Sequence, residues 1–512
     1  DAYFGLGNSY YLKSLNDSAI YYYEKTLVIR KELLGEKHID VAQTYMNIGN
    51  VYDEKSEYDL ALQYNFKSLE TKKELLSEKH TIVAASYNNI GAVYYRKAEF
   101  DLALQYFSNA LEINKELLGE KNSDVAQTYM NIGTIYVNKD EYDLALQYYF
   151  KSLEIKKELL GEKHIDVAMC YNNIGAVYEI KDELDFALQH HFKSLEIKKE
   201  LLGEKHNSVA TSYHNIGLIY SHKHEYDLAL QYYFISLDIR KELLGEKHNL
   251  VATSFNSIGA IYKAKKEYDL ALQYFFRSLE IRAELLGEEH TLVAQSYMNI
   301  GNIYYERNEY DLALQYHNKS LEIKKDLLGE KHTVVAASCT NIGLVYFERN
   351  ELDLALQYFL KALEINEELL GEKHTKLAGN FTNIGNVYAH KDDYGLTLHY
   401  FQKGIASSLL NFEDTLNVYS VPLIIDYLNW HELLELLYTK AEIFVNLWTV
   451  TESDSVLDSL QPRPPPAIIK KDRADYLKSA LQHYRSCDTL INQVRQSIIT
   501  KSDKISLGEQ AI

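Results

Sequence analysis

Apolar residues recur along the chain at helical spacings of three and four, and the whole pattern repeats every 42 residues. One segment of a repeat has a small residue, Ala84, seven positions before Gly91, and Tyr94 three positions after it. A second segment begins at Asp101 and Ala103 and keeps the same spacing. Because residues three and four apart line one side of a helix, each repeat is predicted to be a pair of helices.

One glycine in the first helix marks each repeat. These glycines are Gly7, Gly49, Gly91, Gly133, Gly175, Gly217, Gly259, Gly301, Gly343 and Gly385. A single helix pair cannot bury its apolar side, so neighbouring pairs must stack and share their cores. The pattern predicts an all-α solenoid of about ten helix-turn-helix repeats over residues 1–408, the first of them incomplete, followed by a helical C-terminal extension.

Helix stop and start signals alternate between the repeats. A glycine that can adopt a positive φ closes each second helix, with Ser77 as the one substitution. A histidine follows, and the residue after it can cap the next helix: Thr81, Ser123 (after Asn122), Asn207, Asn249, Thr291, Thr333 and Thr375, or Asp40 and Asp166 one position later. Asp59 and its equivalents fall in the first turn of the second helix, where the helix dipole favours a carboxylate.

Composition narrows the classes of partner. The formal net charge of −19 opposes binding to nucleic acid or to an anionic membrane. No run of eighteen apolar residues predicts a membrane span. Three widely separated cysteines without a CxxC motif suggest a reducing compartment, so a cytoplasmic location is expected. The chain starts at Asp1 inside a repeat, which suggests a piece of a longer protein.

The pattern resembles the tetratricopeptide repeat. Tyr129, Ile132, Gly133 and Tyr136 match its first helix, and Ala145, Tyr149 and Ser152 match its second. The resemblance implies a right-handed superhelix that binds protein segments on the surface of the first helices. Lys157 stands where the family has a proline, so we expect the second helix to continue for about two further turns.

The longer repeat is similar to those of kinesin light chains and nephrocystin-3. The match is the segment LLGEKHIDVAMCYNNIGAVY, residues 159–178, although the family's proline after the histidine is missing. This resemblance implies a fold and a general binding role, and it does not identify the partner.

Asparagines on the first helices are the candidate ligand-binding residues. They are Asn47, Asn88, Asn89, Asn131, Asn172, Asn173, Asn215, Asn299, Asn341 and Asn383, with Ser257 as an exception to the row. Asparagine inside a helix costs about 0.5–0.7 kcal/mol relative to alanine, so a compensating role is expected. Two hypotheses remain: the amides hold the backbone of an extended peptide, or they join adjacent helices.

No catalytic, metal-binding or cofactor-binding residue is predicted. The recurring histidines, such as His80 and His164, fall one per repeat and cannot converge on one ion, so packing or capping is expected. The same holds for His190 and His191, which point to different sides of a helix. Nothing marks Cys170, Cys339 or Cys487 as a nucleophile.

The tail departs from the repeat after residue 408. We expect a helical cap over residues 409–460, a proline-rich linker over 461–470 and a helical segment over 471–512. The last segment resembles the region before the caspase-like CHAT domain of TPR-CHAT proteins, at Ala480, Tyr484, Asp488, Ile491, Arg495, Lys504, Leu507, Glu509 and Ala511.

These features predict a non-catalytic scaffold that binds a peptide or protein partner. The tail resemblance implies the regulatory half of a TPR-CHAT protein, whose protease-like domain would follow this segment. The alternative is an adaptor like kinesin light chain, which needs a heptad coiled coil before the repeats.

Overall fold

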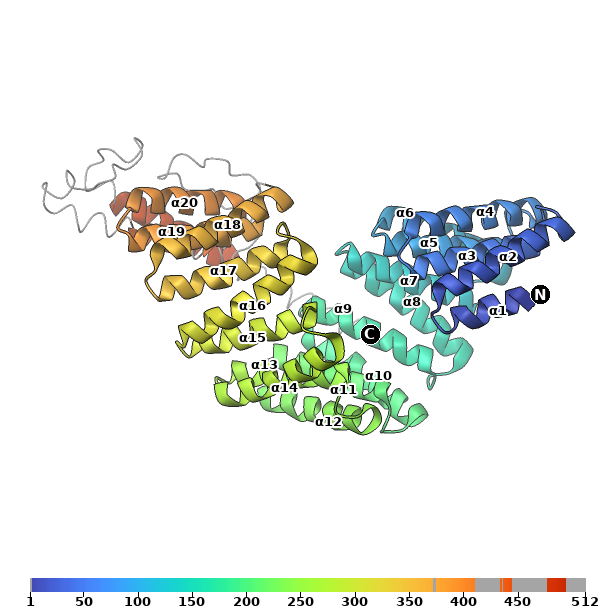
Figure 1. Ribbon diagram of the computed structural model, residues 1–512, viewed down its shortest axis with the longest axis horizontal. Helices are drawn as coiled ribbons and strands as arrows, with labels where there is room; N and C mark the ends of the chain where they lie inside the picture. Colours follow the sequence, from blue (N-terminus) through green and yellow to red (C-terminus); the bar gives the residue numbers. More distant parts are fainter. Residues whose placement is uncertain (1, 372–373, 410–432, 435, 444–476, 494–512) are drawn as a thin grey trace, which may run out of the picture. The chain divides into compact units, whose positions relative to one another are not determined.

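The computed structural model describes residues 2–371, 374–409, 433–434, 436–443 and 477–493. Twenty helices, α1 to α20, form ten consecutive antiparallel pairs in its repeat region (Figure 1). We call the odd-numbered helices A helices and the even-numbered ones B helices. Their bounds are α1 Ala2–Tyr11, α2 Asn16–Leu34, α3 Ile39–Glu54, α4 Tyr58–Leu76, α5 Thr81–Arg96, α6 Phe100–Leu118, α7 Ser123–Asn138, α8 Tyr142–Leu160, α9 Ile165–Ile180, α10 Leu184–Leu202, α11 Asn207–His222, α12 Tyr226–Leu244, α13 Asn249–Ala264, α14 Tyr268–Leu286, α15 Thr291–Glu306, α16 Tyr310–Leu328, α17 Thr333–Glu348, α18 Leu352–Leu370, α19 Thr375–His390 and α20 Tyr394–Ser408.

The two helices of a repeat differ in length. In the second repeat α3 has 16 residues and α4 has 19, with a turn over 55–57 between them and a loop over 77–80 after them. The helix α8 ends at Leu160, three residues after Lys157, so the B helix continues past the family's proline position by less than one turn rather than by the two turns expected. The two helices, the turn and the loop together make up the period of 42 residues.

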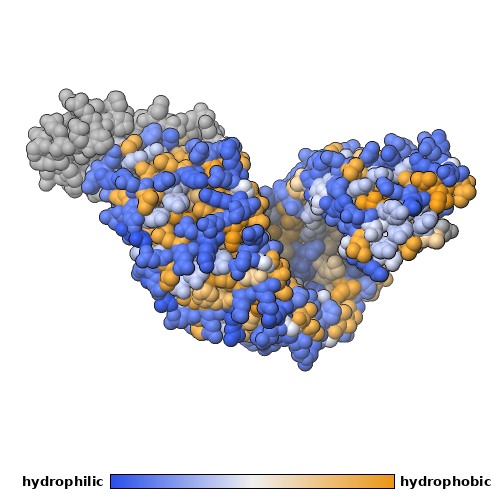
Figure 2. Space-filling view, in the orientation of Figure 1, coloured by the Kyte–Doolittle hydropathy of each residue, from blue (hydrophilic) through white to orange (hydrophobic). Residues whose placement is uncertain are grey.

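The chain forms two compact units, residues 1–246 and 247–512. Within each unit, every helix packs against its neighbours in the sequence. On the face shown in Figure 2, hydrophobic residues are interspersed among hydrophilic ones in both units. The buried hydrophobic residues form separate clusters that join neighbouring helix pairs, rather than one central core, as expected for a repeat protein.

The recurring glycine of each A helix faces a large side chain of its B helix. A Cβ atom at Gly133 would lie 2.7 Å from the ring of Tyr149, and one at Gly217 would lie 2.9 Å from the ring of Tyr233. Any larger residue would separate the two helices. This close approach is the physical reason for the glycine period that marks the repeats in the sequence.

Loop geometry confirms the helix stops and corrects the helix starts. Gly119 has φ +82°, and its counterpart Ser77 has φ +93°. The N-cap of α5 is His80, whose Nδ1 accepts a hydrogen bond from the backbone N–H of Ile82 at 3.1 Å. Thr81 was expected to be the cap, but it is already the first helical residue.

The same correction applies throughout the repeats. His38, His164, His206, His248, His290, His332 and His374 occupy the N-cap, and Asn122 replaces the histidine before α7. Each of these residues has the extended backbone geometry that an N-cap requires. The residues expected to cap, including Ser123, Asn207, Asn249, Thr291, Thr333, Thr375, Asp40 and Asp166, lie inside the helices instead.

Ion pairs at the surface connect neighbouring repeats. Lys97 Nζ, at the end of α5, contacts Asp59 Oδ1, in the first turn of α4, at 3.0 Å. Lys121 Nζ, in the loop before α7, contacts Glu158 Oε1 of α8 at 2.5 Å. The sequence predicted the position of Asp59 in its helix but not its partner in the next repeat.

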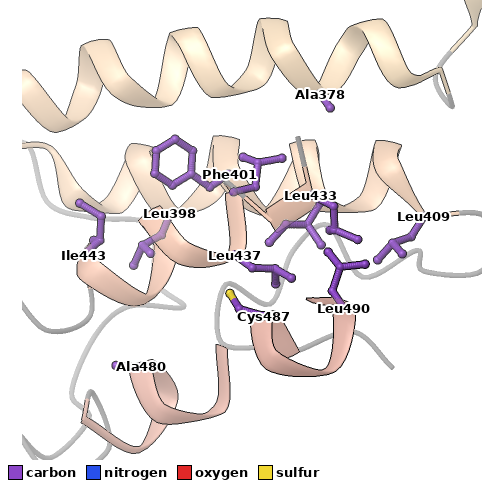
Figure 3. Close-up of a cluster of buried hydrophobic side chains, with 12 residues drawn as sticks. Ala378, Leu398, Phe401, Leu409, Leu433, Leu437, Ile443, Ala480, Cys487 and Leu490 are labelled. Carbon is purple, nitrogen blue, oxygen red and sulfur yellow. The ribbon is translucent and has the colours of Figure 1, made fainter. Parts of the chain in front are cut away.

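Two helical segments of the tail, residues 433–443 apart from 435 and residues 477–493, pack on the last repeat. Figure 3 shows Cys487 next to Leu437, in the cluster that also contains Phe401 of α20, which is fully buried. The expected proline-rich linker, residues 461–470, lies outside the described residues, as does most of the expected cap over 409–460.

Candidate functional site

We call the asparagine row the residues that directly precede the Ile-Gly pair of the A helices. It comprises Asn47, Asn89, Asn131, Asn173, Asn215, Asn299, Asn341 and Asn383, with Ser257 in α13. Each lies two positions before a glycine that faces a B helix. A helix turns about 100° per residue, so the row lies on the side of the A helices that faces away from their B partners. We call this side the A-helix surface.

Every asparagine of the row is half-buried, as are Asn88 and Asn172. The side chains are therefore held by their surroundings and still reach solvent. This degree of burial suits either hypothesis from the sequence, so the hydrogen bonds of the individual amides matter.

Some of these amides join residues of the same A helix. Gln43 Nε2 donates to Asn47 Oδ1 at 2.9 Å, and Gln127 Nε2 donates to Asn131 Oδ1 at 3.2 Å. Gln295 and Asn299 form the same pair at 3.1 Å. The glutamine stands one helical turn before the asparagine, where side chains meet on one side of a helix.

Other amides join neighbouring A helices. Asn215 Nδ2, on α11, donates to Asn172 Oδ1, on α9, at 3.3 Å. Asn299 Nδ2, on α15, donates to Asn256 Oδ1, on α13, at 2.8 Å. These two bonds link positions 43 residues apart. Part of the row therefore contributes to the stacking of repeats.

Side-chain contacts also join α1 with α3 and α5 with α7. Asn47 Nδ2 donates to Asn8 Oδ1 at 3.3 Å, and the hydroxyl of Tyr23 donates to the same oxygen at 2.6 Å. Asn88 makes two long contacts of 3.5 Å with Thr128 Oγ1, one through Nδ2 as donor and one through Oδ1 as acceptor.

Four members of the row remain available for other bonds. Among the described residues, the side chains of Asn89, Asn173, Asn341 and Asn383 form no hydrogen bond. The row is thus of two kinds, with some amides already bonded to the protein and some with donors and acceptors that a ligand can use.

Buried cations lie between the A helices and the B helices. Lys72 of α4 is 2% exposed, and its Nζ donates to Ser86 Oγ of α5 at 3.0 Å. Burial lowers the pKa of Lys72 to about 8. Equivalent buried positions in other repeats are Lys156, Lys198, Arg240, Arg282 and Lys324.

These cations connect to the A-helix surface. Lys156 Nζ contacts Gln127 Oε1 at 3.4 Å, and Gln127 in turn bonds to Asn131. The hydroxyl of Ser338 accepts from Lys324 Nζ at 2.9 Å. Sequence reasoning missed this layer and also Asn256, although a basic residue recurring four positions after Ser68, Ser152 and their equivalents was a visible signal.

Unlike the histidines of the N-caps, His191 and the three cysteines are buried in the packing between helices. His191 is buried against Gly175, and burial lowers its pKa to about 4, so the ring is neutral. Burial raises the pKa of the Cys170, Cys339 and Cys487 thiols, which disfavours the thiolate that a nucleophile requires. In the described part of the chain, no three His, Cys, Asp or Glu side chains are grouped as metal ligands.

No described helix combines the length and the apolar character needed to cross a bilayer.

Comparison with known structures gives distant matches. The chain is similar to BtubC (BKLC) from P. vanneervenii, with 20% sequence identity and a TM-score of 0.40 over 48% of this chain and 99% of that one. It is similar to repeats of a putative kinesin light chain from Podosopora anserina, with 14% identity and a TM-score of 0.37 over 41% and 99% of the two chains. The apo form of RapI matches with 20% identity and a TM-score of 0.43 over 56% and 98%.

Comparison with protein families is decisive. No curated protein matches the chain. The tetratricopeptide repeat matches residues 1–74, 82–158, 124–200, 166–242, 208–281, 250–326 and 333–408. The matched segments cover most of the sequence and coincide with the observed helix pairs, so the chain belongs to the tetratricopeptide repeat family.

Proposed function

We propose that the chain is a protein-interaction scaffold that binds an extended peptide segment on its A-helix surface. The observation that carries this proposal is the set of row amides without a partner, at Asn89, Asn173, Asn341 and Asn383. An amide side chain offers two donors and one acceptor, which suits the N–H and C=O groups of a peptide backbone.

The asparagines of the row that already have hydrogen bonds within the protein are compatible with peptide binding on the A-helix surface. Asn131 is oriented by Gln127, and Asn215 by Asn172. Amides that are fixed before the ligand arrives lose less conformational freedom on binding. On this proposal, the asparagines without a hydrogen bond hold the peptide backbone, and those bonded across A helices also join adjacent repeats.

A selected peptide provides the test of this proposal. A peptide that binds the chain is first isolated from a random peptide library, and its affinity is measured by fluorescence anisotropy. Asn89, Asn131 and Asn173 are then changed together to Ala. The matched control changes the exposed amides Gln105, Gln147 and Gln189, on the B helices of the same repeats, to Ala.

The proposal predicts at least a tenfold loss of affinity, about 1.4 kcal/mol, in the asparagine variant and an unchanged affinity in the glutamine variant. Circular dichroism shows whether both variants keep their helices. Equal affinities of the asparagine variant and the parent would mean that the row is structural.

We further propose that the tail couples the repeats to a following protease-like domain, as the resemblance to TPR-CHAT proteins implies. Ala480, Cys487 and Leu490 of the tail pack in one cluster with Phe401 of the last repeat. A change in the position of α20 would therefore displace the segment 477–493, which packs on it. Arg495, Lys504, Leu507, Glu509 and Ala511 of the same resemblance lie outside the described residues.

The reading frame of the parent protein separates this role from its alternative. A domain with a Cys and His pair after residue 512 supports the sensor role. A heptad coiled coil before the first repeat and no such domain supports an adaptor like kinesin light chain.

A further inference from the structure

The B helices of the fourth and fifth repeats carry two equivalent grooves. The first, of about 540 Å³, is lined by Phe150, Leu153, Glu154, Lys157, Glu158 and Glu162. The second, of about 510 Å³, is lined by the residues 42 positions further along, from Phe192 to Glu204. The lining residues belong to α8 and α10 and to the loops after them, whereas the asparagine row lies on the A helices.

Each groove contains an exposed aromatic ring. Phe150 is 39% exposed and Phe192 is 36% exposed. Phe150 is held edge-on by His190 of the next B helix, with ring centroids 6.0 Å apart, and Phe192 is held by Tyr232 at 6.1 Å. A fixed, accessible ring can stack with the aliphatic stem and the charged end of a lysine or arginine.

Each groove is also acidic, with three glutamates and one lysine in its lining. Two of the three carboxylates of the first groove are already paired, Glu158 with Lys121 at 2.5 Å and Glu162 with Lys157 at 2.7 Å. Glu154 is exposed and has no ion pair among the described residues. It stands four positions after Phe150, so ring and carboxylate share one side of α8.

The second groove repeats this arrangement. Glu200 pairs with Lys163 at 2.6 Å and Glu204 pairs with Lys199 at 2.9 Å. Glu196 is exposed and, within the described residues, has no ion pair. The same spacing of ring and carboxylate recurs at Phe66, Phe234 and Phe276, but those three rings are half-buried. The pairs with an exposed ring are those of the two grooves, in successive repeats.

We propose that these two grooves form a second docking surface, which binds a basic, amphipathic segment of a partner protein. A lysine or arginine of that segment stacks on each ring, and its charge meets Glu154 or Glu196. Charge complementarity selects the partner, because the surplus of carboxylates in each groove and the net charge of −19 both favour a cationic segment.

The chain itself supplies matched positions without the ring. Ser108 in α6 and Asn318 in α16 replace the phenylalanine, while Glu112 and Glu322 keep the carboxylate one turn later. These two glutamates are exposed, like Glu154 and Glu196. Replacing Glu112 and Glu322 therefore removes the same negative charge from positions that lack the phenylalanine ring.

The experiment uses a fluorescein-labelled helical peptide of leucine and lysine, and the same peptide with glutamate in place of lysine. Binding to the chain is followed by fluorescence anisotropy at an ionic strength of about 0.15 M. The test variant combines Phe150→Ala, Phe192→Ala, Glu154→Gln and Glu196→Gln, and the control combines Glu112→Gln and Glu322→Gln. Thermal unfolding verifies that both variants fold.

The proposal predicts that the lysine peptide binds, that the glutamate peptide does not, and that only the test variant weakens binding by about tenfold or more. The variant with alanine at Asn89, Asn131 and Asn173 keeps full affinity for this peptide. Equal losses in the test and control variants would indicate unspecific charge attraction and overturn the proposal. A loss in the asparagine variant, or no binding by the parent, would also overturn it.

Discussion

Asn299 Nδ2 on α15 donates to Asn256 Oδ1 on α13 at 2.8 Å, so one amide of the row holds two successive repeats together. Gln295 also donates to Asn299, which leaves this side chain with both ends engaged. Asn341, at the same position of α17, has no hydrogen bond among the described residues. The two asparagines look equivalent in the sequence and differ in their surroundings.

This difference predicts opposite effects of alanine on stability. Asn299→Ala loses two hydrogen bonds and should lower the free energy of unfolding by about 1 kcal/mol, even after the gain in helix propensity. Asn341→Ala loses none and should be neutral or stabilising by about 0.5 kcal/mol. Urea unfolding of both variants measures the difference, and equal destabilisation would show that the bond to Asn256 contributes nothing.

Ser77 predicts a gain in stability. Its φ of +93° and ψ of 160° fall in a backbone region that glycine populates and other residues avoid. Ser77→Gly should therefore raise the free energy of unfolding by about 1 kcal/mol. The reverse change, Gly119→Ser, is the matched control and should lower it by a similar amount. Thermal unfolding of the two variants is the measurement, and shifts of the same sign would contradict the strain argument.

In most repeats a lysine of the loop before the A helix pairs with a glutamate of the following B helix, and Glu289 interrupts this series. Lys247 pairs with Glu284 at 2.5 Å and Lys331 pairs with Glu368 at 2.6 Å, but the equivalent residues of the repeat between them are Glu289 and Asp326. Glu289→Lys should create the missing pair and raise the unfolding midpoint slightly, with a smaller effect at high salt. In an Asp326→Ala background the same change should have no such salt-dependent effect. A gain that persists in that background would contradict the assignment.

The buried lysines predict a dependence of stability on pH. Burial lowers the pKa of Lys72 and Lys324 to about 8 in the folded chain, below the value of 10.5 for an exposed lysine. Between these values the unfolded chain binds more protons than the folded one, so stability rises with pH in this window. From pH 8 to 9.5 the two lysines together should contribute a rise of about 2–3 kcal/mol.

The variant Lys72→Met with Lys324→Met isolates this contribution. The difference in unfolding free energy between parent and variant should change with pH by that amount, because all other titrating groups are shared. A difference that stays constant from pH 8 to 9.5 would mean that both lysines keep their ordinary pKa.

The repeat architecture could be predicted from the sequence because the same pattern of apolar residues and glycines recurs in every repeat. Gly133 recurs with its period since a Cβ there would meet the Tyr149 ring, and this constraint is local. The caps were assigned one residue too late, or two before α3 and α9, because threonine, serine and aspartate are the commoner caps and His80 accepts through a ring nitrogen instead.

Contacts between repeats were the part that could not be predicted. The bond between Asn256 and Asn299, and the placement of Lys72 beneath the A helices, depend on how neighbouring pairs stack. The spacing of residues along a helix shows on which side of the helix a residue lies. It does not show which side chain of the next repeat that residue contacts. The two kinds of asparagine in the row could be distinguished only from these contacts.

Photo-crosslinking provides the most direct test of the A-helix surface as the peptide-binding site. A photoreactive residue is placed at Ala85, which is exposed on α5 one turn before Asn89, or at Gln147, which is exposed on the B helix α8. With a peptide selected for binding to the chain, we expect a cross-link from position 85 and none from position 147. Cross-linking from position 147 alone would contradict it.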